Sequence, residues 1–248
     1  MGKGAPLRWL ENYVLARHLT TPAHARAACA GGRGFRGRGI EIGALWRKFP
    51  VPGNARVYYV DRLPNEGLQQ HYAEIDGPVV RPDVVADALC LPFARASLDF
   101  VIASHVLEHL PLPLAALRHW YEVLRPEGIL LLKIPDKRYT FDLKRRRTPL
   151  QHLIAEDADP GSFDKQAHFE DWVENVVGCR RGSAEFQQQL SHLLEVDYSI
   201  HYHVWIDEDV RELAEYTRQV LGFEWRPVVF WRAHIYRKEC VLALQRNA

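Results

Sequence analysis

The stretch from Arg38 to Asp61 constrains the fold more than any other part of this 248-residue chain. It holds two apolar segments, Gly39–Gly43 and Arg56–Asp61, and each carries an acid, Glu41 in the first and Asp61 in the second. The two carboxylates stand 20 residues apart. This is the spacing of a βαβ unit that binds a nucleoside at the carboxyl ends of neighbouring parallel strands.

Composition limits the class of protein. An apolar content of 47% and a charged content of 25% are typical of a globular chain with a sizeable core. A formal charge of +1 gives no reason to expect a polyanionic partner. The four cysteines are scattered, so neither a zinc ribbon nor a disulfide framework is expected. No apolar run approaches about 18 residues, and the N-terminus lacks the apolar stretch of a signal peptide. We therefore expect a soluble, cytoplasmic protein.

Short apolar segments alternate with helical patterns along the chain. Strands are predicted at 39–43, 56–61, 84–86, 98–104 and 129–134. This alternation predicts a parallel sheet covered on both faces. Two β-rich stretches close the chain, and the short connection between them predicts an antiparallel hairpin. The predicted fold is α/β: a Rossmann-like, doubly wound, seven-stranded sheet of five parallel strands plus the C-terminal hairpin.

One domain is predicted for residues 1–248. Residues 1–38 are expected to form an amphipathic helix over 7–19 and a glycine-rich lead-in, and 136–205 a helical lid insertion. Pro50, Pro52 and Gly53 leave room for only a stunted helix after the first strand. Thr148 and Asp207 are predicted to cap helices.

Five ordered motifs carry a family resemblance. They are Ile40-Glu41-Ile42-Gly43, then Asp61, then Asp87-Ala88-Leu89, then 97–101 with 104–110, and finally Leu124-Arg125-Pro126-Glu127-Gly128. In this order they resemble the class I methyltransferases that use S-adenosylmethionine, over residues 38–246. The resemblance implies that cofactor, with S-adenosylhomocysteine as product. It places Glu41 and Gly43 at the methionine end, Asp61 at the ribose hydroxyls and Asp87 at the adenine. The cofactor-binding residues implied in this way are Glu41, Gly43, Ala44, Asp61, Arg62, Asp87, Ala88, Leu89, Ser104 and His105.

The sequence departs from the family pattern at one loop. The second and third glycines of Gly-x-Gly-x-Gly are replaced by Leu45 and Arg47. Glycine lets a backbone approach a ligand closely, and larger side chains hold it off. Either the loop takes another path, with Arg47 or Arg62 as a counter-ion for the cofactor carboxylate, or cofactor binding is weaker.

Four residues are candidates for catalysis: His105, Tyr139, His201 and His203. His105 follows the fourth strand, where it can act as a base or simply hydrogen-bond the backbone of a turn. His201 and His203 lie two apart on an extended segment, which turns them the same way. They can face the acceptor, pack in the lid, or bind a metal with His168, His192, Glu195 or Asp197. We assign no metal, although a divalent ion remains an option. Glu108 and His109 are expected to hold a helix start.

The predicted function is methyl transfer to an oxygen, or a nitrogen, of a small molecule such as a specialised metabolite or a sugar-containing compound. Oxygen is favoured because several histidines gather where a base is needed. Lys144–Arg147 is either a solvated patch or a grip on an anionic acceptor. No nucleic acid and no membrane are expected as partners, and the protein is expected to be a monomer or homodimer.

Two rival functions remain open. A nucleic-acid methyltransferase would use Arg33–Arg38 and Lys144–Arg147 as phosphate contacts, and its binding would fall steeply with salt. A regulatory module that binds a cofactor or a metal without catalysis would release no S-adenosylhomocysteine with any acceptor.

Overall fold

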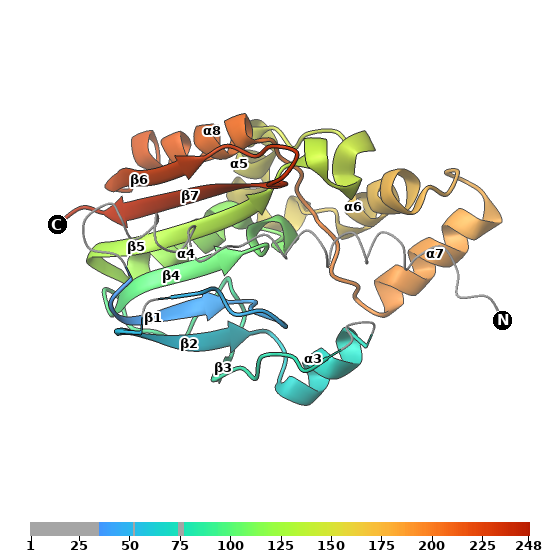
Figure 1. Ribbon diagram of the computed structural model, residues 1–248. Helices are drawn as coiled ribbons and strands as arrows, with labels where there is room; N and C mark the ends of the chain where they lie inside the picture. The colour runs from blue at the N-terminus through green and yellow to red at the C-terminus, as the bar shows by residue number, and fades with distance from the viewer. Residues whose placement is uncertain (1–34, 52, 74–76) are drawn as a thin grey trace.

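The computed structural model describes residues 35–51, 53–73 and 77–248, so the helix predicted at 7–19 lies outside the described residues. One seven-stranded sheet forms the centre of the molecule (Figure 1). Its strands are β1 (Gly37–Ile42), β2 (Ala55–Asp61), β3 (Val84–Val85), β4 (Leu98–Ser104), β5 (Leu124–Pro135), β6 (Trp225–Trp231) and β7 (Glu239–Arg246). The order is β3-β2-β1-β4-β5-β7-β6, and only the pairings of β7 are antiparallel. The predicted fold class is confirmed.

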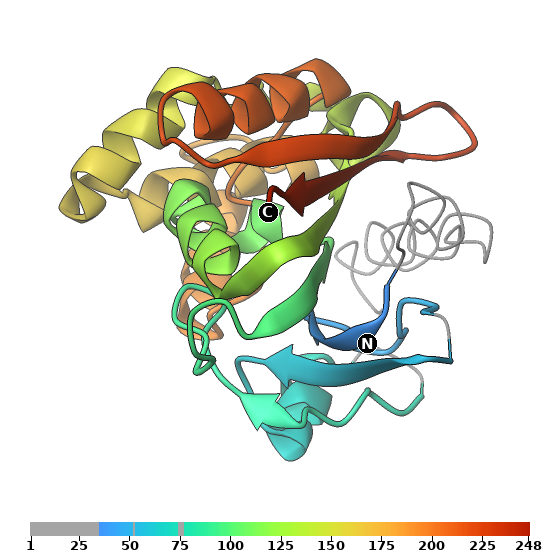
Figure 2. The same cartoon turned by 90° about the vertical axis from the view of Figure 1, so that its left-hand side faces the viewer.

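Both faces of the central strands are buried, which explains their nearly continuous apolar sequences. On one face, α4 (Pro113–Val123) packs beside β4 and β5, and α8 (Asp207–Gln219) lies beside β6 and β7 (Figure 2). Trp120 of α4 is fully buried there, and its indole Nε1 donates to the Ala88 carbonyl at 2.8 Å. The other face carries a smaller cluster that includes Phe35 and Phe49.

Two connections differ from an ordinary doubly wound sheet. The described residues between β1 and β2 contain no helix, in line with the predicted stunted crossover, and the short α3 (Asn65–His71) follows β2 instead. β5 begins at Leu124, directly after α4, rather than at Ile129. Leu124 pairs with Leu98 before the ladder resumes at Ile129 with Phe100, so the intervening residues bulge out. This bulge hid the start of the strand from sequence reasoning.

The segment 136–205 forms the predicted helical insertion, beyond the end to which the arrows of β1 and β4 point (Figure 1). It comprises η3 (Lys137–Tyr139), η4 (Phe141–Lys144), α5 (Leu150–Ala158), η5 (Pro160–Ser162), α6 (Lys165–Trp172), the π-helical turn η6 (Val173–Val177) and α7 (Ala184–Glu195). An apolar cluster of its own, centred on Phe169, Trp172 and Phe186, supports it. None of the described helices is long and apolar enough to cross a membrane.

The predicted helix caps at Thr148 and Asp207 are both wrong. Pro149 precedes the first turn of α5 without a side-chain bond, while the Thr148 hydroxyl accepts the Val204 N–H at 2.9 Å. Ile206 occupies the N-cap of α8, and Asp207 is its first helical residue. Both polar side chains are used for tertiary contacts instead of local ones.

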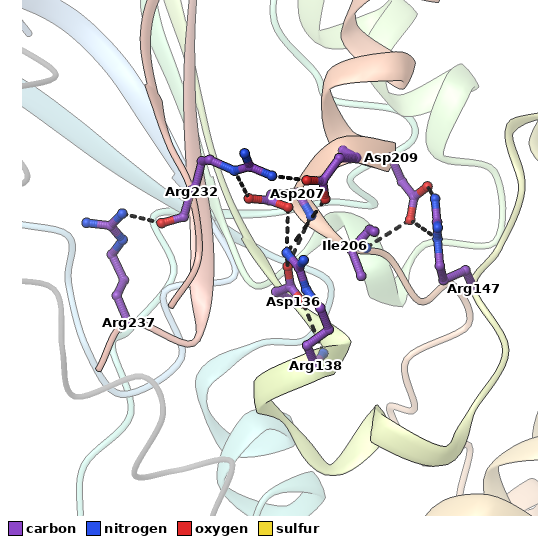
Figure 3. A network of polar contacts seen from close by, with 9 residues as sticks. Asp136, Arg138, Arg147, Ile206, Asp207, Asp209, Arg232 and Arg237 are labelled. Carbon is purple, nitrogen blue, oxygen red and sulfur yellow. Dashed lines mark hydrogen bonds and ion pairs between the residues drawn. The ribbon is translucent and has the colours of Figure 1, made fainter. Parts of the chain in front are cut away.

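A buried ionic network fastens the insertion to the core (Figure 3). Arg138 of η3 bridges Asp136, at the end of β5, and Asp207, with nitrogen–oxygen distances of 2.6 and 2.5 Å. The Arg232 Nε donates to the other oxygen of Asp207 at 2.8 Å. The network therefore joins the start of the insertion, α8 and the residue after β6.

Candidate active site

A cavity of about 310 Å³, here called the main cavity, lies between the carboxyl ends of the parallel strands and the insertion. Ligand pockets in proteins start at about 300 Å³. We call its core side the sheet wall and its insertion side the lid wall. The sheet wall includes Gly43, Asp61, Arg62, Asp87, Ala88, Leu89 and His105. The lid wall includes Phe141, Trp172, Asp197, Ser199, His201 and Tyr202.

The main cavity collects most of the residues that sequence reasoning selected. All seven named residues of the sheet wall were predicted cofactor contacts, and His201 of the lid wall was a predicted catalytic residue. Glu41, Ala44 and Ser104 instead line an adjoining hollow of about 20 Å³, which Gly43 also borders. His203 and Tyr139 border neither space.

Two carboxylates of the sheet wall lie at the carboxyl ends of the neighbouring strands β2 and β3. Asp61 is the last residue of β2, and its Oδ1 accepts the Arg62 N–H at 2.8 Å. Asp87 follows β3, and its Oδ1 accepts the Leu89 N–H at 2.8 Å in a tight turn. A carboxylate offers about four acceptor positions, so each has further capacity for donors on a ligand.

Glu41 has a role that its sequence motif does not reveal. Its side chain is buried, and both carboxylate oxygens lie 2.9 Å from the Phe49 N–H. This contact folds the loop that follows β1 back onto the strand. Glu41 therefore shapes the adjoining hollow, and its direct contact with a cofactor stays a prediction.

The loop with the missing glycines keeps a glycine-like backbone. Gly43 and Leu45 have φ values of 64° and 50°, and the Arg47 N–H closes the turn onto the Ala44 carbonyl at 2.9 Å. A left-handed backbone costs a residue such as leucine roughly 1–2 kcal/mol. The Leu45 side chain offsets this cost by packing on Leu68 of α3. Leu45 also borders the main cavity, and the two alternatives for this loop stay predictions.

His105, immediately after β4, also has a left-handed backbone, with φ 56°. Its N–H donates to the Lys133 carbonyl at 2.8 Å, and its Nδ1 lies 3.5 Å from Glu108 Oε1. The side chain is buried at the edge of the main cavity. Strained non-glycine residues of this kind cluster at active sites and ligand clamps, so the observation favours a functional role.

On the lid wall, a buried carboxylate orients His201. The His201 Nδ1 lies 2.7 Å from Asp142 Oδ2, and Arg145 Nη1 donates to Asp142 Oδ1 at 2.9 Å and to the His201 carbonyl at 2.8 Å. Burial raises the pKa of Asp142, but the charges and hydrogen bonds of His201 and Arg145 outweigh it and hold that pKa below its ordinary value. An ionised Asp142 fixes the ring with its proton on Nδ1, which makes Nε2 the acceptor atom.

Sequence reasoning missed Asp142. It lies 59 positions from His201, inside an insertion where no periodicity links the two residues.

The predicted counter-ion Arg62 crosses between the two walls. Its Nη1 lies 3.2 Å from Asp197 Oδ2, and Lys165 Nζ approaches the other oxygen at 2.5 Å. Beside them, burial and then the charge of Asp197 raise the pKa of Tyr202 to about 12. Tyr202 is therefore a neutral phenol throughout the ordinary pH range.

The basic run Lys144–Arg147 is neither a simple solvated patch nor a ready grip for an anion. Arg145 is buried and pairs with Asp142 and, through Nε at 2.6 Å, with Asp171. Arg147 pairs with Asp209 of α8. Arg145 therefore stabilises the interior of the insertion, while the exposed Arg147 links the start of α5 to α8.

His203 and Tyr139 lie away from the main cavity. His203 is fully buried, stacks on Trp205 and approaches the Pro111 carbonyl at 3.3 Å through Nε2. Burial, and then nearby His168, lowers the pKa of His203 to about 3, so its ring is neutral. Tyr139 packs beside the Arg138 guanidinium. Their assignment to catalysis receives no support from this geometry, and His201 and His203 do not act as a pair on one space.

Comparison with known proteins adds a family match. Residues 36–132 match the model of a family described as a methyltransferase domain. Among curated proteins none matches the chain.

Solved structures share the fold at low identity. A candidate zinc-dependent alcohol dehydrogenase of Rhodobacter sphaeroides is 14% identical, with a TM-score of 0.52 over 90% of each chain. A candidate histamine N-methyltransferase of Thermotoga maritima is 16% identical, with a TM-score of 0.48 over 97% of this chain and 96% of that one. The CurJ carbon methyltransferase is 18% identical, with a TM-score of 0.44 over 89% of this chain; this chain spans about half of that one, 51%.

The matched region contains β1, β2, β3, β4 and most of β5, which together carry the sheet wall. Over residues 36–132 the chain is therefore similar to a methyltransferase domain, and the solved structures share the fold of its seven-stranded sheet.

Proposed function

We propose that the sheet wall binds S-adenosylmethionine and that the lid wall binds a small molecule, which is methylated on a hydroxyl oxygen. One observation carries the proposal: a single cavity joins Asp61 and Asp87, at the strand ends, to the Asp142–His201 pair in the insertion.

The sheet wall has the donor and acceptor pattern that the cofactor requires. The carboxylates of Asp61 and Asp87 can accept the ribose hydroxyls and the adenine amino group, while Ala88 and Leu89 offer apolar contact. A Cβ on Gly43 would lie 2.9 Å from Val106 Cγ2, so only glycine permits this close course of the backbone. The bound cofactor supplies an electrophilic methyl group on a sulfonium with a neutral leaving group.

The lid wall supplies a base. In the proposed function His201 Nε2 would accept the proton of the acceptor hydroxyl, and S-adenosylmethionine held by the sheet wall would supply the methyl group. The ionised Asp142 then stabilises the imidazolium of His201. General base catalysis contributes about 10²- to 10⁴-fold in rate. A neutral amine acceptor needs no such base, which is why the Asp142–His201 pair supports oxygen.

Positioning contributes more than proton transfer. Holding two reactants in line can supply on the order of 7–11 kcal/mol of a barrier. Phe141 and Trp172 on the lid wall pack edge to face, with ring centroids 5.3 Å apart, and Trp172 is almost completely buried. These rings exclude water from the space beside His201.

The test separates cofactor binding from acceptor choice. Calorimetry with S-adenosylhomocysteine should show one site per chain; no binding would overturn the proposal. The purified enzyme is then assayed for S-adenosylhomocysteine release with pools of hydroxylated metabolites, of amines, and of RNA or DNA at two salt concentrations.

Each outcome of the assay decides between functions. Turnover with hydroxyl compounds that falls in His201→Asn supports the proposal. Turnover confined to amines, and unaffected by His201→Asn, would show that the acceptor atom is nitrogen and not oxygen. Salt-sensitive turnover confined to nucleic acid would establish the first rival function. His192→Ala, an exposed histidine of α7, is the matched control and should keep full turnover.

A further inference from the structure

Two groups of histidine and carboxylate side chains in the described part of the chain bring their ligand atoms within 4.8 Å of one another. Glu108, His109 and His201 form the first group, which belongs to the main cavity. The second group consists of His152, Glu156 and His168. It has no part in the proposed methyl transfer, and its geometry calls for a separate explanation.

The second group spans two helices of the insertion. His152 and Glu156 are four residues apart on α5, so they lie on one face of that helix. His168 comes from the neighbouring α6. The Glu156 Oε1 lies 3.0 Å from His152 Nε2 and 3.4 Å from His168 Nε2. Two ligands bonded at 2.0–2.1 Å around a tetrahedral zinc ion lie about 3.3 Å apart. The observed spacing therefore suits a common ion.

The carboxylate of Glu156, at the centre of this group, is buried, but one of its oxygens lacks a hydrogen bond from the part of the chain that the structure describes. Glu156 is 4% exposed, and its Oε2 has no hydrogen-bond partner among the described residues. His203 Nε2 lies 3.9 Å from that oxygen, too far for a hydrogen bond. A buried carboxylate is costly unless it is paired or coordinates a metal.

A second cavity gives an ion access to this group. Its volume is about 360 Å³, and His152, Glu156 and His168 line it together with Tyr202. Tyr202 also borders the main cavity, so one side chain touches both spaces. The three ligands thus meet a route from solvent while their carboxylate remains buried.

We propose that His152, Glu156 and His168 bind a divalent cation of the zinc type. Two imidazoles and one carboxylate form a known ligand set for zinc, with a further position open to water. Nitrogen ligands disfavour Mg²⁺ and Ca²⁺, which prefer oxygen. The ion joins α5 to α6 and thereby fixes the part of the insertion that carries Tyr202.

The proposal is tested on the full chain by metal analysis. Protein dialysed against a strong chelator is titrated with ZnCl₂ by calorimetry, with MgCl₂ as the negative control, and the expected stoichiometry is one Zn²⁺ per chain. Cobalt(II) serves as an optical probe, because tetrahedral Co²⁺ absorbs visible light much more strongly than octahedral Co²⁺. His168→Ala and Glu156→Gln should each abolish stoichiometric binding.

Folding and location are controlled separately. His192→Ala should bind Zn²⁺ like the unaltered protein, since this histidine of α7 belongs to neither group. S-adenosylhomocysteine binding and far-UV circular dichroism identify variants that have not folded. Addition of Zn²⁺ to chelated protein should raise the Tm of the unaltered protein and leave that of Glu156→Gln unchanged.

Three results would overturn the proposal. They are the absence of stoichiometric Zn²⁺ binding, binding that survives Glu156→Gln combined with His168→Ala, and binding that is lost only in Glu108→Gln. The last would place the ion at the main cavity. None of these outcomes depends on methyl transfer, so the proposed function can fail while the metal site stands.

Discussion

The two walls of the main cavity are built in different ways. The sheet wall presents Asp61 and Asp87 at strand ends, each bonded to a backbone N–H close by in the chain. The lid wall presents His201, held by the buried charges of Asp142 and Arg145. Carboxylates with spare acceptor capacity suit binding, whereas an imidazole with a fixed tautomer suits proton transfer. We therefore expect substitutions on the sheet wall to change cofactor affinity and substitutions on the lid wall to change turnover.

The largest effect should come from His201→Asn. Loss of the base is expected to lower turnover by about 10²- to 10⁴-fold, while S-adenosylhomocysteine affinity stays unchanged. Steady-state kinetics and calorimetry on the same preparation measure both quantities. A parallel loss of cofactor affinity would break the division between the walls.

Asp142→Asn tests the charge network behind His201. It leaves the Arg145 guanidinium short of its buried partner, which should lower the free energy of unfolding by about 3–5 kcal/mol at neutral pH. The pKa of Asp142 is lowered in the folded state, so the stabilisation is complete above the ordinary value of 3.8 and is lost as the pH falls below it. Urea denaturation across this pH range should show the two proteins converging in acid.

A matched control uses a more exposed pair. Asp157 pairs with the half-exposed Arg118 at 2.8 Å. Asp157→Asn should therefore cost only about 1 kcal/mol or less. An equal loss of unfolding free energy in Asp142→Asn and Asp157→Asn would show that burial does not increase the contribution of the Asp142 network to stability.

On the sheet wall, Asp61→Ala should weaken S-adenosylhomocysteine binding by about 1.5–3 kcal/mol, the worth of hydrogen bonds to a charged group. Turnover at saturating cofactor should be retained. Asp83→Ala is the control, because Asp83 bonds the Tyr59 N–H at 2.8 Å and does not border the main cavity. Unchanged affinity in Asp61→Ala, measured by calorimetry, would remove the ribose assignment.

Gly43→Ala should have the smallest effect. A left-handed backbone costs alanine roughly 1–2 kcal/mol, and the new Cβ would press on Val106 at the edge of the cavity. Both cofactor affinity and stability should fall. Gly182→Ala has the same backbone strain, with φ 82° and open space around its Cβ, and should lower stability alone. Thermal denaturation and calorimetry separate the two.

The sheet wall was predictable from sequence for a simple reason. Apolar runs mark buried parallel strands, and residues that follow such strands meet at one edge. Asp61, Asp87 and His105 therefore came together as expected. Glu41 was placed correctly in its strand, but its bond to Phe49 depends on a loop of irregular path that no pattern describes.

The lid wall was largely beyond sequence reasoning. Asp142 and His201 meet only after the insertion has folded, and the dense charge around Arg145 resembled a surface run although the residue is buried. Leu45 illustrates the converse case. This leucine has the left-handed backbone usual for glycine, and its packing on Leu68 offsets the strain. Periodicity and propensity carry no information about such compensation.

The insertion leaves and rejoins the sheet at adjacent points. Asp136 and Trp205 form an isolated bridge, and the Lys137 N–H donates to the Trp205 carbonyl at 2.9 Å. The Asp207 N–H donates to Asp136 Oδ2 at 3.1 Å (Figure 3). Seventy residues of chain thus return to their point of departure, as a cassette does between fixed junctions. If the proposed function holds, another insertion grafted between these junctions should change which acceptors are recognised and leave cofactor binding intact.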